Sequence, residues 1–333
     1  MLGFCSNPRF TEHETSSQHP ERPDRIRAIW AALTQAGFLN SPNPFPDFTC
    51  DFGTLPHAKE ALLELSFAPA DVKWLAAIHS RRHIEYVERM SLLGGGLLDD
   101  GDTPVGPDSY EIALLAVGAT LRACDAVMSG QVKRCFVAER PPGHHADPDR
   151  PAGFCLFNNV AIATRYLQRT FGIRRACIVD FDVHHGNGTQ TCFEDDPNVF
   201  YISLHQNPRT CYPGTGNDWE TGIGPGQGHT LNIALEPGMG DQQYLEALQE
   251  RVIPALDAFA PEIMLLSAGF DAHQDDPIAQ INLTDETFEH MTRSLVAVAD
   301  QRCQGRVVSV LEGGYNLRAL GRSVVRHLIG LQE

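Results

Sequence analysis

The hydrophobic positions along the chain follow two alternating patterns. Several stretches repeat apolar residues at the three-to-four-residue spacing of a helix and end at a plausible helix stop. Between them lie short apolar runs rich in β-branched residues, which are typical of buried strands. The predicted helices are 24–37, 109–130, 158–172, 241–259 and 284–305, and the predicted strands are 135–138, 176–181, 199–204, 263–268 and 306–311. This alternation predicts an α/β fold, with a mostly parallel sheet covered by helices on both faces.

Local signals add detail to this prediction. Pro254 predicts a kink in the helix at 241–259, and Thr284 is expected to cap the helix that follows it. The Gly- and Pro-rich stretches 94–107 and 207–228 are expected to be long loops. Because no shift in composition flanks them, residues 1–333 are expected to form a single domain.

Reactive side chains follow four of the predicted strands. The runs are ERPPGHHADP after 135–138, DFDVHHGNG after 176–179, GFDAHQDDP after 263–268 and EGGYN after 306–311. In open α/β sheets the ligand site lies outside the carboxyl ends of the strands. The four runs are therefore expected to converge on one place, with the active site there.

A catalytic metal site is the first chemistry that these loops suggest. Asp182 and His184 are two residues apart, and in an extended chain such side chains point to the same face. Asp271, at the end of another strand, can supply a third ligand. Three protein ligands leave a position open for water, and mixed nitrogen and oxygen ligands suit one Zn²⁺ per chain, although Fe²⁺, Co²⁺ or Mn²⁺ could occupy the same set.

The other acids in these loops receive different predictions. Asp180 adjoins a buried strand and is expected to support the site, because a buried carboxylate must be paired or hydrogen-bonded. Asp275 and Asp276 are expected to be exposed loop acids without a role.

His144 and His145 lie on a loop stiffened by two prolines and a glycine, as a positioned acid–base group requires. Asp180 is the expected partner of one histidine and Asn187 of the other. Tyr315 follows two glycines and could donate a hydrogen bond to a developing oxyanion.

Composition narrows the choice of partners. The formal net charge of −16 disfavours direct binding to nucleic acid and favours cationic partners such as lysine-rich peptides. The nine cysteines show no CxxC spacing, which indicates reduced thiols. No signal peptide or membrane-spanning run is recognised, so a cytoplasmic protein without membrane contact is expected.

Read together, RPPGHHA, GFCLFNN, DFDVHHGNGTQ, YPGTG, SAGFDAHQDDP and LEGGYN resemble, in order, the motifs of zinc-dependent histone deacetylases. HPERPDR at 19–25 is similar to the usual N-terminal segment of that family. The resemblance covers roughly residues 5–330 and is closer to class II enzymes and their bacterial histone deacetylase-like amidohydrolase relatives than to class I.

The resemblance implies an arginase-like fold and hydrolysis of the Nε-acetyl-lysine amide to lysine and acetate. It implies Zn²⁺ at Asp182, His184 and Asp271, His145 as general base and then acid, and His144 as its electrostatic partner. Tyr315 would polarise the substrate carbonyl, and hydroxamate-type inhibitors would bind the zinc. The substrate-binding residues would be Asp102, Gly153, Phe154, Tyr212, Ile278, Gly313 and Gly314.

The resemblance also implies bound K⁺. One ion would lie at Asp180, Asp182, His184, Ser203 and Leu204, and a second would involve Phe193, Asp196 and Val199.

Three positions bear on the choice among alternatives. Asn187 stands where class I members have an Asp, and Tyr315 is present where the nearly inactive class IIa members have a His. Some acetylpolyamine deacetylases carry a Glu where Ile278 stands, which favours acyl-lysine in a peptide here. A hydrolase of acetylated small amines, a weakly active acyl-lysine binding module and an arginase-type dimanganese hydrolase remain the alternatives.

Overall fold

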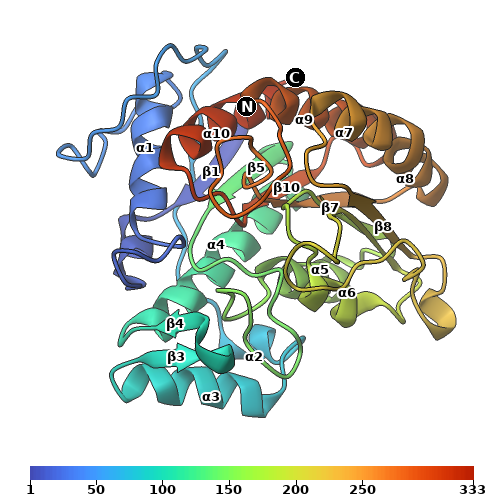
Figure 1. Ribbon diagram of the computed structural model, residues 1–333, viewed down its shortest axis with the longest axis horizontal. Coiled ribbons are helices and arrows are strands. Elements are labelled where there is room, and N and C mark those ends of the chain that lie inside the picture. The colour runs from blue at the N-terminus through green and yellow to red at the C-terminus, as the bar shows by residue number, and fades with distance from the viewer.

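An eight-stranded sheet runs through the middle of the protein, with helices on both of its faces (Figure 1). The computed structural model describes residues 1–333, apart from the side chain of Asp100. All neighbouring strands of this sheet are parallel, which confirms the predicted fold class. In spatial order the strands are β2 (Leu63–Glu64), β1 (Leu2–Ser6), β5 (Arg134–Ala138), β10 (Val307–Leu311), β9 (Ile263–Ala268), β6 (Ala176–Asp180), β7 (Val199–Gln206) and β8 (Thr230–Leu235).

The helices form two layers (Figure 1). One layer contains α1 (Asp24–Gln35), α7 (Asp241–Ala247), α8 (Ile253–Phe259), α9 (Asp285–Arg302) and α10 (Leu317–Leu331). The other contains α2 (Val72–Leu75), α4 (Ser109–Met128), α5 (Asn159–Phe171) and α6 (Asn187–Phe193). Outside these layers, α3 (Arg81–Leu92) lies beside the small antiparallel pair β3 (Gly96–Leu98) and β4 (Thr103–Val105).

The central strands are apolar because both faces of the sheet are covered. Every residue of β5, β6, β9 and β10 is buried. Val137, Val179 and Val310 are fully buried examples, and each such side chain contributes roughly 1.5–3 kcal/mol relative to an exposed one.

The strand order brings the reactive loops together. The four strands that precede them, β5, β10, β9 and β6, are consecutive neighbours in the sheet. Since the strands are parallel, all four carboxyl ends open at one edge, as predicted.

Three local predictions need correction. The stretch 94–107 is no loop, since β3 and β4 form a hairpin there through a 3₁₀ turn at Asp99–Gly101. Thr284 precedes α9 but makes no capping hydrogen bond, because its hydroxyl donates to Asp241 at 2.9 Å. The helix 241–259 is continuous, and its irregularity is a π-helical turn at Leu248–Val252, which ends just before Pro254.

No helix in the described part of the chain is both long enough and apolar enough to span a bilayer.

Candidate metal and catalytic site

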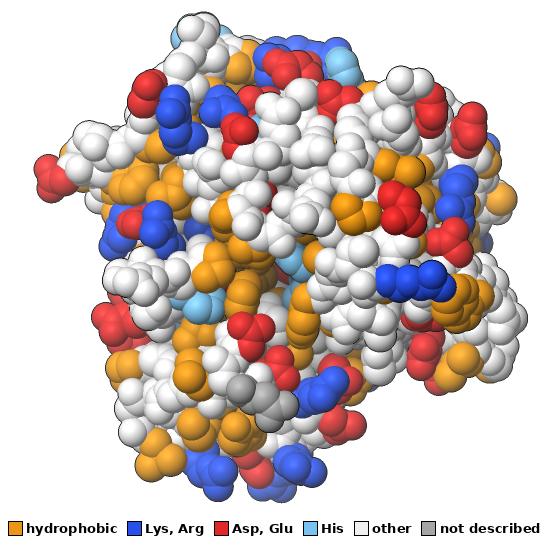
Figure 2. All heavy atoms as spheres, viewed as in Figure 1, with side chains coloured by type: hydrophobic (Ala, Val, Ile, Leu, Met, Phe, Trp, Pro, Cys, Tyr) orange, Lys and Arg blue, Asp and Glu red, His pale blue; other side chains and the backbone are white. Residues whose placement is uncertain are grey.

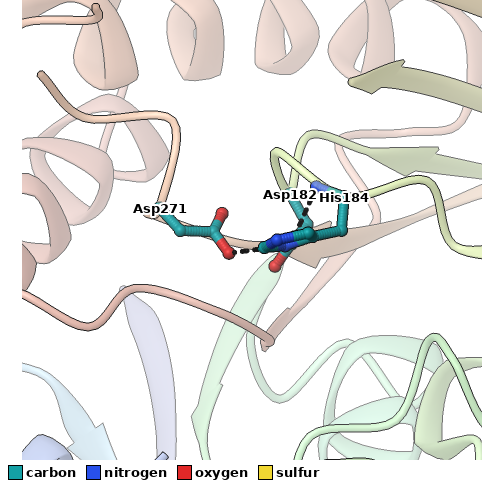
Figure 3. A group of neighbouring side chains, drawn as sticks. All are labelled: Asp182, His184 and Asp271. Atoms are coloured by element: carbon teal, nitrogen blue, oxygen red, sulfur yellow. Dashed lines mark hydrogen bonds and ion pairs between the residues drawn. The ribbon is translucent and has the colours of Figure 1, made fainter. Parts of the chain in front are cut away.

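A buried cluster of potential metal ligands lies at the carboxyl edge of the sheet. Asp182, His184 and Asp271 each offer a ligand atom, and these atoms lie within 4.8 Å of one another (Figure 3). The Nδ1 atom of His184 is 3.0 Å from Asp182 Oδ1 and 3.2 Å from Asp271 Oδ2. Among the described residues this is the one such group. The structure therefore brings together the three residues expected to bind metal.

The local geometry differs from the expected extended chain. Strand β6 ends at Asp180, and residues 182–184 form a bend. The backbone N–H of His184 donates to Asp182 Oδ1 at 2.9 Å, which closes an Asx turn and holds the two side chains together. The pleat of a strand is therefore the wrong explanation for this pairing.

The triad suits a divalent cation. Asp182 and Asp271 are fully buried, and two carboxylates so close together repel each other unless a positive charge offsets them. Each is held in place by a backbone donor: the N–H of Gly313 reaches Asp182 Oδ2 at 2.7 Å, and that of Val183 reaches Asp271 Oδ1 at 2.9 Å. Two carboxylate oxygens and an imidazole are a ligand set that Zn²⁺ accepts.

Position 313 has room only for a glycine. A Cβ atom at this position would lie 2.1 Å from Asp271 Oδ2 and 2.5 Å from Asp182 Oδ2. The glycine therefore lets the loop after β10 pass directly beside the triad.

His144 is held as a cation next to the triad. Its Nδ1 donates to Asp180 Oδ2 at 3.0 Å. Burial alone would lower the pKa of His144, but Asp180, Asp182 and Glu312 outweigh it and raise that pKa to about 10. Asp180 also accepts from the Tyr201 hydroxyl at 3.0 Å, so this buried carboxylate is paired as expected.

His145, unlike His144, is neutral. Burial and repulsion by the His144 cation lower its pKa well below the ordinary value, so the ring is neutral. Its Nδ1 donates to Asn187 Oδ1 at 2.7 Å, which leaves the Nε2 lone pair free to accept a proton. The two histidines therefore have the two partners that the sequence predicted.

A cavity of about 330 Å³ opens above these groups. In Figure 2 it is the hollow with hydrophobic walls and histidine at its base. The lining residues that were expected at the site are Asp102, His145, Gly153, Phe154, His184, Tyr212, Ile278 and Tyr315. Three further lining residues were not expected there: Pro20, Thr210 and Cys211.

Aromatic rings form the cavity walls. The rings of Phe154 and Tyr315 are 6.0 Å apart, and those of His145 and Tyr212 are 4.9 Å apart. Phe154 has a φ of 69°, which is rare for a bulky residue. The hairpin holds this conformation, because the N–H of Phe154 donates to Thr103 Oγ1 at 3.1 Å and that of Gly153 to Asp99 Oδ2 at 3.3 Å.

The structure contradicts the prediction that Asp276 is an exposed acid. It is only 8% exposed. Its Oδ2 accepts from the backbone N–H of Tyr315 at 2.8 Å and its Oδ1 from that of Ile278 at 3.1 Å. Asp276 thereby connects two cavity-lining residues, whereas Asp275 is half-exposed and pairs with Arg322.

Glu312 and Glu21 are supporting acids that the sequence reasoning missed. Glu312 accepts from the N–H groups of Gly143 at 2.7 Å and His144 at 3.1 Å. Glu21 is fully buried between Arg25 and Arg140. The sequence signal for Glu312 was its position inside the Gly-rich motif LEGGYN. The signal for Glu21 was its position near arginines in HPERPDR.

The remaining expected residues lie around this centre. Gly313 and Gly314 are outside the described cavity lining, and the Gly314 carbonyl accepts from Arg25 Nε at 2.8 Å. Near the first expected K⁺ position, the Ser203 hydroxyl is 2.8 Å from His205 Nδ1, and the Leu204 carbonyl accepts from Tyr244 at 3.5 Å. Near the second, the carbonyls of Phe193 and Asp196 accept from the N–H groups of Asp196 and Val199.

Known proteins resemble this chain over its whole length. A family model described as a histone deacetylase domain matches residues 19–331. Histone deacetylase clr3 of Schizosaccharomyces pombe is 39% identical over 99% of this chain and 48% of its own length. The histone deacetylase-like amidohydrolase of Pseudomonas aeruginosa is 39% identical over 82% of this chain and 72% of its own. The chain thus spans about half the length of clr3.

A solved structure shows the same fold. The HDA15 HD domain superposes with a TM-score of 0.87 at 35% identity, covering 100% of this chain and 89% of that domain.

Proposed function

The chain belongs to the histone deacetylase family, and we propose that residues 1–333 form one catalytic domain that hydrolyses the amide of Nε-acetyl-lysine in a protein or peptide. One observation carries the proposal. A neutral His145, with a free Nε2, and the phenol of Tyr315 line the same cavity above the Asp182–His184–Asp271 triad.

The cavity suits an acyl-lysine side chain. Its aromatic walls, Phe154 and Tyr212, can pack along the apolar stem of the lysine. Asp102 lies at the exposed rim, where its carboxylate can accept hydrogen bonds from the N–H groups of the peptide backbone. Ile278, at the same rim, adds a neutral apolar surface.

His145, supported by His144, performs the acid–base chemistry. His145 Nε2 removes the proton from the attacking water and later delivers it to the departing lysine amine. Asn187 keeps the Nδ1–H tautomer that this role requires. The His144 cation, fixed by Asp180, adds positive charge beside the negative charge that develops on the substrate.

Tyr315 stabilises the oxyanion. Burial and the nearby carboxylates Asp271 and Asp182 raise the pKa of its phenol well above the ordinary value, so it stays protonated as a donor. Its hydroxyl can then donate to the substrate carbonyl oxygen as charge develops there. A Zn²⁺ ion held by the triad would supply Lewis acidity towards the carbonyl and the water.

Other parts of the proposal rest on the family resemblance. K⁺ would bind at Asp180, Asp182, His184, Ser203 and Leu204, and at Phe193, Asp196 and Val199. Acetylated small amines are the alternative substrate class, and hydroxamates would bind the zinc. The nine free cysteines support a reducing, cytoplasmic location.

The test is hydrolysis of an acetyl-lysine peptide by wild-type protein and by His145→Ala, with the metal content of both measured. His145→Ala is expected to lose turnover while binding as much zinc as the wild type. The control is His290→Ala, on the exposed side of α9. Substantial turnover by zinc-loaded His145→Ala would contradict the assigned role.

A further inference from the structure

A second cavity adjoins the acyl-lysine cavity. It is a groove of about 720 Å³ between α3, the β3–β4 hairpin and the loop at 149–151. The two cavities share a wall, because Asp99 and Pro151 line the groove while Asp102 and Gly153 line the acyl-lysine cavity. The hydrogen bond from the N–H of Gly153 to Asp99 Oδ2 ties the two sides of this wall together. A peptide emerging from the first cavity can therefore continue directly into the groove.

Three arginines line this groove. Arg82 and Arg89 lie seven residues apart on α3, which places them on one face of the helix, and Arg150 lies on the facing loop. All three side chains are exposed. Within the described part of the chain, none of the three forms an ion pair, even though acidic residues outnumber basic ones by 42 to 26.

Two of the three acids that line the groove contact other groups. Glu85 pairs with Arg81, outside the groove, at 2.6 Å. Asp99 accepts from Gly153. Asp149 also lines the groove, so the surface carries both charges. The guanidinium groups of the three arginines nevertheless have no carboxylate partner among the described residues.

The floor of the groove is ordered by His83. The side chain is buried, and its Nε2 donates to the Leu156 carbonyl at 2.8 Å, which fixes the ring. The Nδ1 atom is buried as well, so it does not face the open groove. His83 therefore gives the groove a fixed floor against which an extended peptide can lie.

A groove on the other side of Tyr315 provides a contrast. It is lined by Arg22, Arg318 and Asp275 among others. Here the charges are paired: Arg22 with Asp24, Arg318 with Asp51 and Asp275 with Arg322. Of these two grooves, the one at α3 is lined by arginines that have no carboxylate partner among the described residues.

We propose that the groove lined by Arg82, Arg89 and Arg150 binds an acidic side chain, Asp or Glu, close to the acetyl-lysine in the substrate peptide. This inference rests on the proposed function and names the class of sequence that the site selects. Arginine suits the role because its planar guanidinium can bind a carboxylate through two hydrogen bonds. Exposed pairs of this kind are weak, so each contact is expected to change kcat/KM by about two- to five-fold.

The experiment uses pairs of acetyl-lysine peptides that differ only in Glu or Gln at successive positions on each side of the acetyl-lysine. The readout is the ratio of kcat/KM within each pair, so the fraction of active enzyme cancels. We expect a ratio of about three or more at one or two positions in the wild-type protein, decreasing as salt is added.

Variants identify the groove as the origin of this ratio. The triple variant Arg82→Gln, Arg89→Gln, Arg150→Gln is expected to bring the ratio close to one. Arg318→Gln, in the opposite groove, is the control and is expected to keep it. A wild-type ratio of one at every position, or a ratio that survives in the triple variant, overturns the inference.

A substrate without flanking residues separates this outcome from failure of the proposed function. Acetyl-lysine with both ends blocked cannot reach the groove. Hydrolysis of this compound together with a Glu/Gln ratio of one rejects the groove alone. No hydrolysis of it or of any acetyl-lysine peptide by zinc-loaded protein rejects the proposed function itself.

Discussion

The carboxylate of Asp276 accepts a hydrogen bond from the backbone N–H of Tyr315 at 2.8 Å. The two residues come from the loops after β9 and β10, so this bond joins neighbouring loops at the edge of the sheet. A third loop is joined in the same way, since Glu312 accepts from the backbone of Gly143 and His144. The active site is therefore positioned by carboxylates of one loop that bind the backbone of the next.

Replacing Asp276 is expected to impair catalysis through Tyr315. In Asp276→Ala the Tyr315 backbone loses its anchor, and a misplaced phenol should lower kcat roughly 10- to 100-fold with little change in KM. The control is Asp275→Ala, at the half-exposed neighbour. Combining Asp276→Ala with Tyr315→Phe should lower kcat no further than Tyr315→Phe alone. Fully additive effects would show that Asp276 acts elsewhere.

Tyr315→Phe removes the proposed oxyanion donor while keeping the ring that packs against Phe154. The expected loss in kcat is about 100-fold or more on an acetyl-lysine peptide. Steady-state kinetics on purified protein measure it. Turnover close to that of the wild type would refute the role of the phenol.

Ile278→Glu tests the choice between peptide and polyamine substrates. Ile278 lines the mouth of the cavity and is 37% exposed, so a glutamate there would face an incoming cationic chain. The rate on acetylspermidine relative to an acetyl-lysine peptide is expected to rise. Ile223→Glu, at an exposed isoleucine outside the cavity lining, is the control. If both variants leave the relative rates unchanged, position 278 does not determine specificity.

Glu21 is expected to contribute to stability in a pH-dependent way. Burial alone would raise the pKa of Glu21, but its ion pairs with Arg140 and Arg25 lower it to about 2. Because the pKa is depressed in the folded state, this contribution is complete above the unfolded-state pKa, roughly 4.3. It is lost as the pH falls from there towards 2.

Glu21→Gln should therefore unfold about 3–5 kcal/mol more easily than the wild type near neutral pH, because it leaves buried arginines without their partner. The difference should shrink as the pH falls below about 4. Denaturant unfolding measures it, with Glu12→Gln, from an exposed ion pair, as the control. A difference that does not depend on pH would contradict this explanation.

The sequence predicted the parts of the fold whose signal is local. The strands β5, β6, β9 and β10 are continuous apolar runs, and the reactive residues follow them directly. Parallel strands then require these residues to meet, so the triad and the histidine partners could be predicted without coordinates.

The missed elements have weaker local signals. Helix α10 went unrecognised because Gly321 and Gly330 interrupt its apolar pattern. Gly321 is needed for packing, since a Cβ atom there would lie 2.3 Å from Phe52 Cε1. The hairpin at 96–105 has the sequence pattern of a loop, because its glycines obscure two short strands.

The role of Asp276 could not be predicted for another reason. In sequence it is one of two adjacent loop acids, and nothing local distinguishes it from Asp275. Only the packing of the loop after β10 against the loop after β9 buries one acid and leaves the other half-exposed. Such contacts depend on the tertiary arrangement and leave no periodic pattern in the chain.

Metal content measured together with activity tests whether the Asp182–His184–Asp271 triad binds the one zinc ion on which hydrolysis depends. The purified protein is stripped with a chelator and titrated with Zn²⁺ while hydrolysis of an acetyl-lysine peptide is followed, alongside Asp271→Ala, which lacks one ligand. We expect activity to be lost on stripping and to return in proportion to zinc, saturating at one ion per chain, and we expect Asp271→Ala to recover neither binding nor activity. Full activity in the metal-free protein, or a requirement for two ions per chain, would contradict this expectation.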